Sequence, residues 1–106
     1  MKIPERAIQS QILQWLGYHH IKAFRINAGM VRTGEGRSSR IIRMAPKGFS
    51  DIMGVLPGGR AIFIEVKAKG GKPTQMQLDF LGDMIAQGAI ALVAYCTEDV
   101  EKELGV

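Results

Sequence analysis

The sequence predicts an α/β fold in which a central mixed β-sheet is flanked by α-helices, and three observations lead to this class. Apolar residues recur at helical spacing in two segments, 4–16 and 74–87. Three short apolar segments, 51–56, 61–68 and 89–96, have the length and composition of buried strands. The chain has 106 residues, 46% of them hydrophobic, which is enough to build the core of a single domain over 1–106.

The first half of the chain is expected to hold a helix, a strand, a loop and a second strand. The helix over 4–16 should end where Gly17 interrupts the apolar spacing. Alternation of apolar and polar residues predicts a strand at 22–28. Residues 29–40, rich in glycine and serine, are expected to form a flexible loop before a short strand at 41–44.

The second half contains clearer start and stop signals. Thr74, followed three residues later by Gln77, forms a capping box, which predicts the start of a helix that stops at Gly88. The chain then ends in a short helix over 97–104, for which Thr97 is the expected cap. The predicted order of elements is therefore α, β, β, β, β, α, β, α.

Three charged residues, Asp51, Glu65 and Lys67, lie in segments that otherwise read as buried strands. A charge is expensive to place there unless something pairs with it, so such residues are more often functional than incidental. Glu65 and Lys67 are two positions apart in one strand, and their side chains leave the same face of the sheet.

The turn between the two strands decides whether Asp51 joins that face. A three-residue loop, Pro57-Gly58-Gly59, with Pro57 in a type I position and Gly59 left-handed, would pair Asp51 with Glu65. A two-residue turn at the glycines would place Asp51 on the opposite face. The proline before two glycines favours the longer loop.

Two opposed carboxylates repel each other, so we expect a cation between them. Mg²⁺ or Mn²⁺ is the predicted cofactor, because these ions prefer oxygen ligands and keep positions open for water and phosphate. The alternative is a structural one, in which Lys67 alone neutralises the carboxylate pair.

A basic segment precedes these strands and indicates a polyanionic partner. Between residues 30 and 48 the only acid is Glu35, against five cations. We expect these cations, together with Lys69, to bind DNA; they are Arg32, Arg37, Arg40, Arg43 and Lys47. The alternative is a solvated charged loop without a ligand.

The segments FSDIMGV, GGRAIFIEVKAKGG and TQMQLDFL resemble the VRR-NUC domain, a branch of the PD-(D/E)XK nuclease superfamily, over most of the chain. The resemblance implies the restriction-endonuclease-like fold and a set of catalytic residues. That set is Glu5, Asp51, Glu65, Lys67 and Gln77. Ser50 stands where the superfamily motif has proline, which shapes the strand entry and binds no metal.

These roles agree with the chemistry of the residue types. Asp51 and Glu65 would hold the metal, with the carbonyl of Val66 as a third ligand, and Lys67 would stabilise charge on the scissile phosphate or orient water. Glu5 would bind the metal directly or through water, although a glutamate in a first helical turn also suits the helix dipole. Gln77 is explained equally by the capping box.

The sequence thus predicts a metal-dependent, structure-specific DNA endonuclease. Its resemblance to stand-alone phage and prophage proteins implies cleavage of branched double-stranded DNA, namely four-way (Holliday) junctions. Because a junction is resolved by two symmetric cuts and this chain has one expected active site, we expect a homodimer. The alternatives are a non-catalytic nucleic-acid-binding module, a flap or nicking nuclease, and a sequence-reading nuclease.

The expected location is the cytoplasm of a bacterial host or phage-infected cell, without a membrane. No apolar run approaches the roughly 18 residues that cross a bilayer. The single cysteine, Cys96, excludes an internal disulfide framework, and its apolar surroundings predict a buried, inert thiol.

Overall fold

The structure, a computed structural model, describes residues 2–26, 30–43 and 45–106, with segments 30–33 and 40–43 described by their backbone. The elements occur in the order α1 (Glu5–Tyr18), β1 (Lys22–Arg25), β2 (Met30–Thr33), the 3-10 helix η1 (Gly36–Ser38), β3 (Arg40–Arg43), β4 (Ile52–Val55), β5 (Ala61–Val66), α2 (Gln75–Ala86), β6 (Ile90–Ala94) and α3 (Thr97–Leu104).

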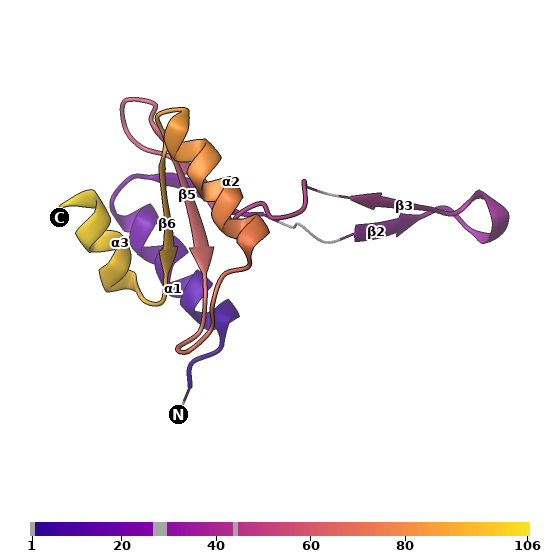
Figure 1. The fold of residues 1–106 in the computed structure, drawn as a ribbon, viewed down its shortest axis with the longest axis horizontal. Helices are drawn as coiled ribbons and strands as arrows, with labels where there is room; N and C mark the ends of the chain where they lie inside the picture. Colours follow the sequence, from indigo (N-terminus) through magenta and orange to yellow (C-terminus); the bar gives the residue numbers. More distant parts are fainter. Residues whose placement is uncertain (1, 27–29, 44) are drawn as a thin grey trace.

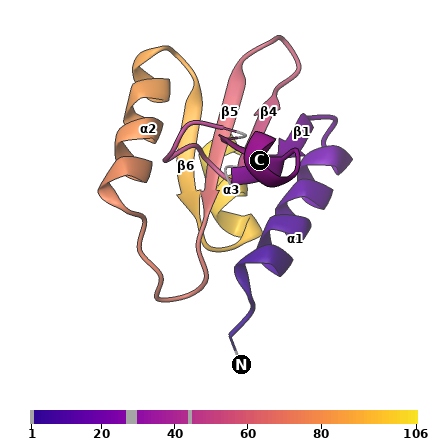
Figure 2. The same ribbon diagram turned by 90° about the vertical axis from the view of Figure 1, so that its right-hand side faces the viewer.

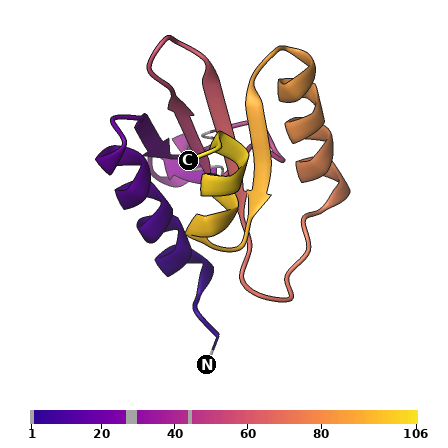
Figure 3. The ribbon, with the colours of Figure 1, turned by 90° about the vertical axis from the view of Figure 1, so that its left-hand side faces the viewer.

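The predicted mixed sheet flanked by helices is confirmed. Four strands form it in the order β1-β4-β5-β6, with β5 and β6 parallel and the other pairs antiparallel. The helices α1 and α3 pack together against one face, and α2 packs against β5 and β6 on the other. Figures 2 and 3 show the sheet from its two sides, with α1 beside β1 and α2 beside β6.

Each face of the sheet has its own apolar cluster. The larger cluster lies under α1 and α3, where Ile12 and Leu16 of α1 meet Ile64 and Val66 of β5, all fully buried. The smaller one lies under α2, around Phe63 of β5. This alternation along β5 puts Phe63 and Glu65 on the α2 face, because successive residues of a strand point to opposite faces.

The predicted register between β4 and β5 is also confirmed. Ile52 pairs with Ile64, and at the turn the backbone N–H of Leu56 donates to the carbonyl of Arg60 at 2.8 Å. The loop has the expected length, but the predicted type I turn is wrong. Gly58 has a φ of +101°, which a type II turn requires at that position and a type I turn does not allow.

Residues 30–43 form a hairpin, so the flexible loop predicted for 29–40 is wrong for the part that the structure describes. β2 and β3 pair antiparallel, with Val31 opposite Ile42, and make a two-stranded sheet of their own. Apolar pairs in each strand support the extended backbone, and Gly34 (φ +80°) and Gly36 (φ +55°) allow the tip to turn. Figure 1 shows the hairpin standing away from the rest of the molecule.

Two helix ends differ from the prediction. α1 continues through Gly17, and His20 takes the left-handed conformation instead (φ +63°), while the N–H of Ile21 donates to the carbonyl of Leu16 at 2.9 Å. This is a Schellman ending, which buries Ile21 in the core directly after the helix.

Thr97 is the first residue of α3 rather than its cap. The cap position belongs to Cys96, whose side chain makes no capping hydrogen bond. Cys96 is half-buried rather than fully buried, and burial raises the pKa of its thiol, which agrees with an unreactive cysteine.

On the α2 side, half of the sheet has no helix over it. α2 covers β5 and β6, so Phe24 of β1 is 63% exposed, although its strand periodicity suggested a core residue. No helix among the described residues has the length and apolar character needed to span a membrane.

Candidate metal centre

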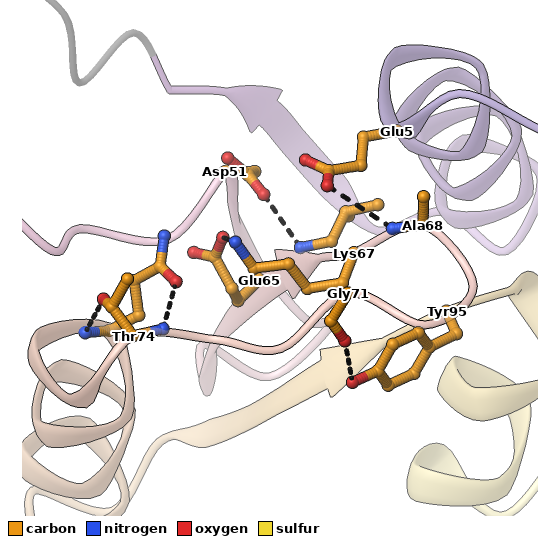
Figure 4. A network of polar contacts seen from close by, with 10 residues as sticks. Glu5, Asp51, Glu65, Lys67, Ala68, Gly71, Thr74 and Tyr95 are labelled. Carbon is orange, nitrogen blue, oxygen red and sulfur yellow. Dashed lines mark hydrogen bonds and ion pairs between the residues drawn. The ribbon is translucent and has the colours of Figure 1, made fainter.

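Asp51 and Glu65 lie next to each other where β4 begins and β5 approaches its end. The residues Ile52 and Ile64 are paired, so the positions just beyond them, Asp51 and Glu65, oppose each other on one sheet face. The Oδ2 atom of Asp51 accepts a hydrogen bond of 2.8 Å from the backbone N–H of Val66, which fixes its carboxylate beside β5 (Figure 4).

Glu65 is a buried acid with an incomplete set of partners. It is 2% exposed, and its buried Oε1 atom makes no hydrogen bond with the described residues. Its Oε2 atom lies 3.7 Å from the Nζ atom of Lys67, which is itself 15% exposed. Lys67 therefore approaches the Oε2 side of the carboxylate, whereas no cation among the described residues lies within 4.0 Å of Oε1.

Burial and the neighbouring carboxylate of Asp51 raise the pKa of Glu65 from 4.5 to about 8. Burial is the largest cause, followed by the charge of Asp51 and a side-chain hydrogen bond between the two carboxyl groups, and Glu5 adds a smaller contribution in the same direction. Lys67 lowers the pKa but does not compensate for the other effects. A second cation at this position would favour the charged form of Glu65.

These groups fit a hard divalent cation. The carboxylates of Asp51 and Glu65 supply the oxygen donors that Mg²⁺ and Mn²⁺ prefer, and Oε1 of Glu65 has no hydrogen bond within the described residues. The N–H of Val66 points toward Asp51, and in an extended strand the carbonyl of the same residue points to the same side. The backbone geometry thus agrees with the predicted third ligand, the Val66 carbonyl.

Glu5 lies at the margin of the pair rather than within it. It is the first residue of α1, and its Oε2 atom is 3.5 Å from the backbone N–H of Ala68, just after β5 (Figure 4). In the described part of the chain, no three Asp, Glu, His or Cys side chains group closely enough to share an ion. A contribution of Glu5 through a bridging water stays a prediction.

Gln77 completes the predicted capping box at the start of α2. Its Oε1 atom accepts from the N–H of Thr74 at 2.8 Å, and the N–H of Gln77 donates to Oγ1 of Thr74 at 3.1 Å. Because the box holds the side-chain oxygen, a catalytic role would have to use the amide nitrogen of Gln77. That role stays a prediction.

Two further contacts shape the backbone around the pair. Ser50 is fully buried, and its hydroxyl donates to the carbonyl of Ile52 at 2.9 Å, so this serine fixes the backbone at the start of β4. On the other side, the hydroxyl of Tyr95 donates to the carbonyl of Gly71 at 2.9 Å and anchors the segment between β5 and α2 (Figure 4).

The predicted DNA-binding residues are spread over the hairpin and the loops near the pair. Arg37, Lys47 and Lys69 are exposed. Arg32 belongs to β2, and Arg40 and Arg43 to β3, where the side chains lie outside the described part of the structure.

Sequence reasoning missed three polar residues near Asp51. Arg6 and Gln9 of α1 and Arg25 of β1 line a cleft of about 390 Å³ together with Ile26 and Asp51. Arg25 lies on the α1 face of an edge strand, and the spacing of Arg6 and Gln9 puts them on neighbouring turns of one helix. The sequence showed that Arg25 lies in a short strand, but this position alone does not identify the residues that Arg25 contacts.

The comparisons with known proteins agree with the fold described above. No protein-family model matches the chain, and no curated protein does. A solved structure described as a VRR_NUC domain is similar to it, with a TM-score of 0.67 and 24% sequence identity, over 95% of this chain and 94% of that one. The chain therefore has the fold of the VRR_NUC domain.

Proposed function

We propose that the protein is a metal-dependent, structure-specific DNA endonuclease of the VRR-NUC type that cuts branched DNA, with Holliday junctions as its substrate. The observation that carries this proposal is the opposed pair of Asp51 and Glu65, in which a buried carboxylate oxygen has no hydrogen-bond partner among the described residues although Lys67 is adjacent. The fold that the chain shares with a VRR_NUC domain supports the same activity.

In this proposal Asp51, Glu65 and the carbonyl of Val66 hold Mg²⁺ or Mn²⁺. The cation would supply Lewis-acid stabilisation of the charge developing on the phosphate and would lower the pKa of the attacking water. Lys67 places its ammonium beside the same site, where it can stabilise a phosphate oxygen or orient water. Water adds to phosphorus as one ester P–O bond breaks, and the departing sugar oxygen gains a proton.

The hairpin and the exposed basic residues would hold the DNA backbone. A two-stranded β-ribbon is narrow enough to enter the major groove, and this hairpin stands clear of the body of the molecule (Figure 1). Its sequence, residues 30–43, contains four arginines and one acid, Glu35. Binding through these cations should therefore weaken steeply as salt increases.

The working unit would be a homodimer. A four-way junction is resolved by two symmetric cuts, and a C₂ pair of chains supplies two sites related by the same symmetry. Sedimentation of the protein alone and on a junction tests this step. A strict monomer in both states would remove the junction-resolving role and favour a flap or nicking nuclease.

The function is tested by cleavage of matched four-way junction, flap, duplex and single-stranded DNA under one set of ionic conditions, with Mg²⁺, Mn²⁺ or EDTA. We expect metal-dependent cleavage that is fastest on the junction and absent in Asp51→Asn and Glu65→Gln. Asp83→Asn is the matched control, because Asp83 is an exposed acid of α2. Binding without cleavage of any substrate would instead identify a non-catalytic module.

A further inference from the structure

The cleft beside Asp51 has features that the metal-dependent chemistry does not use. It lies between α1 and β1 and is lined by Arg6, Gln9, Arg25, Ile26 and Asp51. Two guanidinium groups therefore share a cleft with a carboxylate of the candidate metal centre.

Arg25 is held in place by α1. Its Nε atom donates to Oε1 of Gln9 at 2.8 Å, and its Nη2 atom donates to Oγ of Ser10 at 3.0 Å and to the carbonyl of Arg6 at 3.4 Å. Ser10 in turn donates to the carbonyl of Arg6 at 3.1 Å. These neutral acceptors orient the guanidinium and leave its positive charge unbalanced.

No carboxylate pairs with either arginine among the described residues, where the ion pair within 4.0 Å is that of Lys67 with Glu65. The Nη1 atom of Arg25 likewise makes no hydrogen bond with the described residues. A guanidinium that is fixed by neutral groups and lines a cleft is suited to a phosphate oxygen, to which Arg25 can donate through Nη1.

We propose that this cleft is a second phosphate-binding subsite, in which Arg6 and Arg25 hold the phosphodiester next to the scissile one. The inference rests on the proposed nuclease function, because Asp51 borders both the metal centre and the cleft. One DNA strand would pass from the carboxylate pair into the cleft, and the two arginines would set the position of the scissile phosphate over Asp51 and Glu65.

The test uses the four-way junction of the cleavage assay with single methylphosphonate linkages, which remove the charge of one phosphate at a time. Binding is measured by fluorescence anisotropy in EDTA, and cleavage is measured with Mg²⁺. For the wild type, we expect one linkage next to the cut site to weaken binding about tenfold, the scale of a charge-assisted hydrogen bond. Arg6→Gln should lose about as much on unmodified DNA and show no further loss with that linkage.

Arg60→Gln is the matched control, because it removes the same charge from an exposed arginine at the opposite end of β4 and β5; like Arg25, Arg60 donates to a backbone carbonyl, that of Gly88 at 2.9 Å. Arg25→Lys tests the second arginine while keeping its charge, and it should lose part of the effect because the forked donors are gone. Equal sensitivity of wild type and Arg6→Gln to every linkage would overturn the subsite. If one linkage weakens binding of the wild type but not of Arg6→Gln, and no DNA is cleaved with Mg²⁺, the subsite would stand and the nuclease function would be refuted.

Discussion

Glutamine in place of Glu65 should make the metal-free protein more stable at about pH 8 while abolishing cleavage. Glu65 is buried, its Oε1 atom has no hydrogen-bond partner among the described residues, and its pKa is raised to about 8. In the unfolded chain the same carboxyl titrates at 4.5. Between these two values the folded protein holds a proton that the unfolded chain has released.

The sign of the pH dependence follows from this difference in bound protons. The stabilising contribution is complete below the unfolded pKa and is lost as the pH rises toward the folded pKa. A slope of about 1.4 kcal/mol per pH unit gives an upper limit of about 4 kcal/mol lost between about pH 5 and pH 8. Relaxation and entry of water around Asp51 reduce this, so we expect about 2–4 kcal/mol.

Urea denaturation in EDTA, followed by the fluorescence of Trp15, measures the free energy of unfolding of both proteins across this pH range. The wild type should lose stability relative to Glu65→Gln as the pH rises, and added Mg²⁺ should restore the wild type alone. Asp83→Asn, an exposed change, controls for the loss of one charge. Parallel pH profiles for wild type and Glu65→Gln would refute the reasoning.

Three further changes test the fold and the DNA-binding surface. Gly54→Ala should cost about 1–3 kcal/mol of unfolding free energy, because its Cβ would lie 2.7 Å from the carbonyl oxygen of Lys22; an unchanged urea midpoint would mean that β1 shifts freely. Thr74→Ala should cost about 1 kcal/mol by thermal or urea unfolding, whereas Thr74→Ser should retain the capping box. Neutralising three hairpin arginines should weaken binding to DNA and flatten its salt dependence, and unchanged affinity at low and moderate salt would place the DNA elsewhere. The three changes are Arg32→Gln, Arg37→Gln and Arg40→Gln.

The pairing of β4 with β5 could be predicted because it depends on local chemistry. Loop length fixes which residues oppose each other, and alternation along a strand fixes the face, so Pro57-Gly58-Gly59 was sufficient to place Asp51 opposite Glu65. The capping box at Thr74 was visible for the same reason, since both of its hydrogen bonds join residues three apart. The turn type was missed, because two successive glycines permit more than one combination of dihedral angles.

Features that depend on tertiary packing could not be predicted in this way. Phe24 is exposed because α2 packs against β5 and β6 rather than β1. The periodicity of β1 indicates which residues share a face, but it does not indicate which strands a distant helix covers. Arg25 donates a hydrogen bond to Gln9, sixteen positions earlier in the chain, across the interface between α1 and β1. The hairpin was missed because its short apolar pairs are separated by arginines and glycines, a composition that also suits a loop.

Lys67 alone does not offset the burial and the neighbouring negative charges that raise the pKa of Glu65. Asp51 and Glu5 both raise the pKa of Glu65. Lys67 lowers it, and its Nζ atom lies 3.7 Å from Oε2 of Glu65. With both carboxylates ionised, Asp51, Glu65 and Lys67 carry a net charge of −1, which a cation between the two carboxylates would offset. The raised pKa of Glu65 favours its protonated form, so a cation bound by this carboxylate would displace the proton. We therefore expect burial of Glu65 to lower the stability of the metal-free fold as the pH rises and to favour binding of a cation at this position.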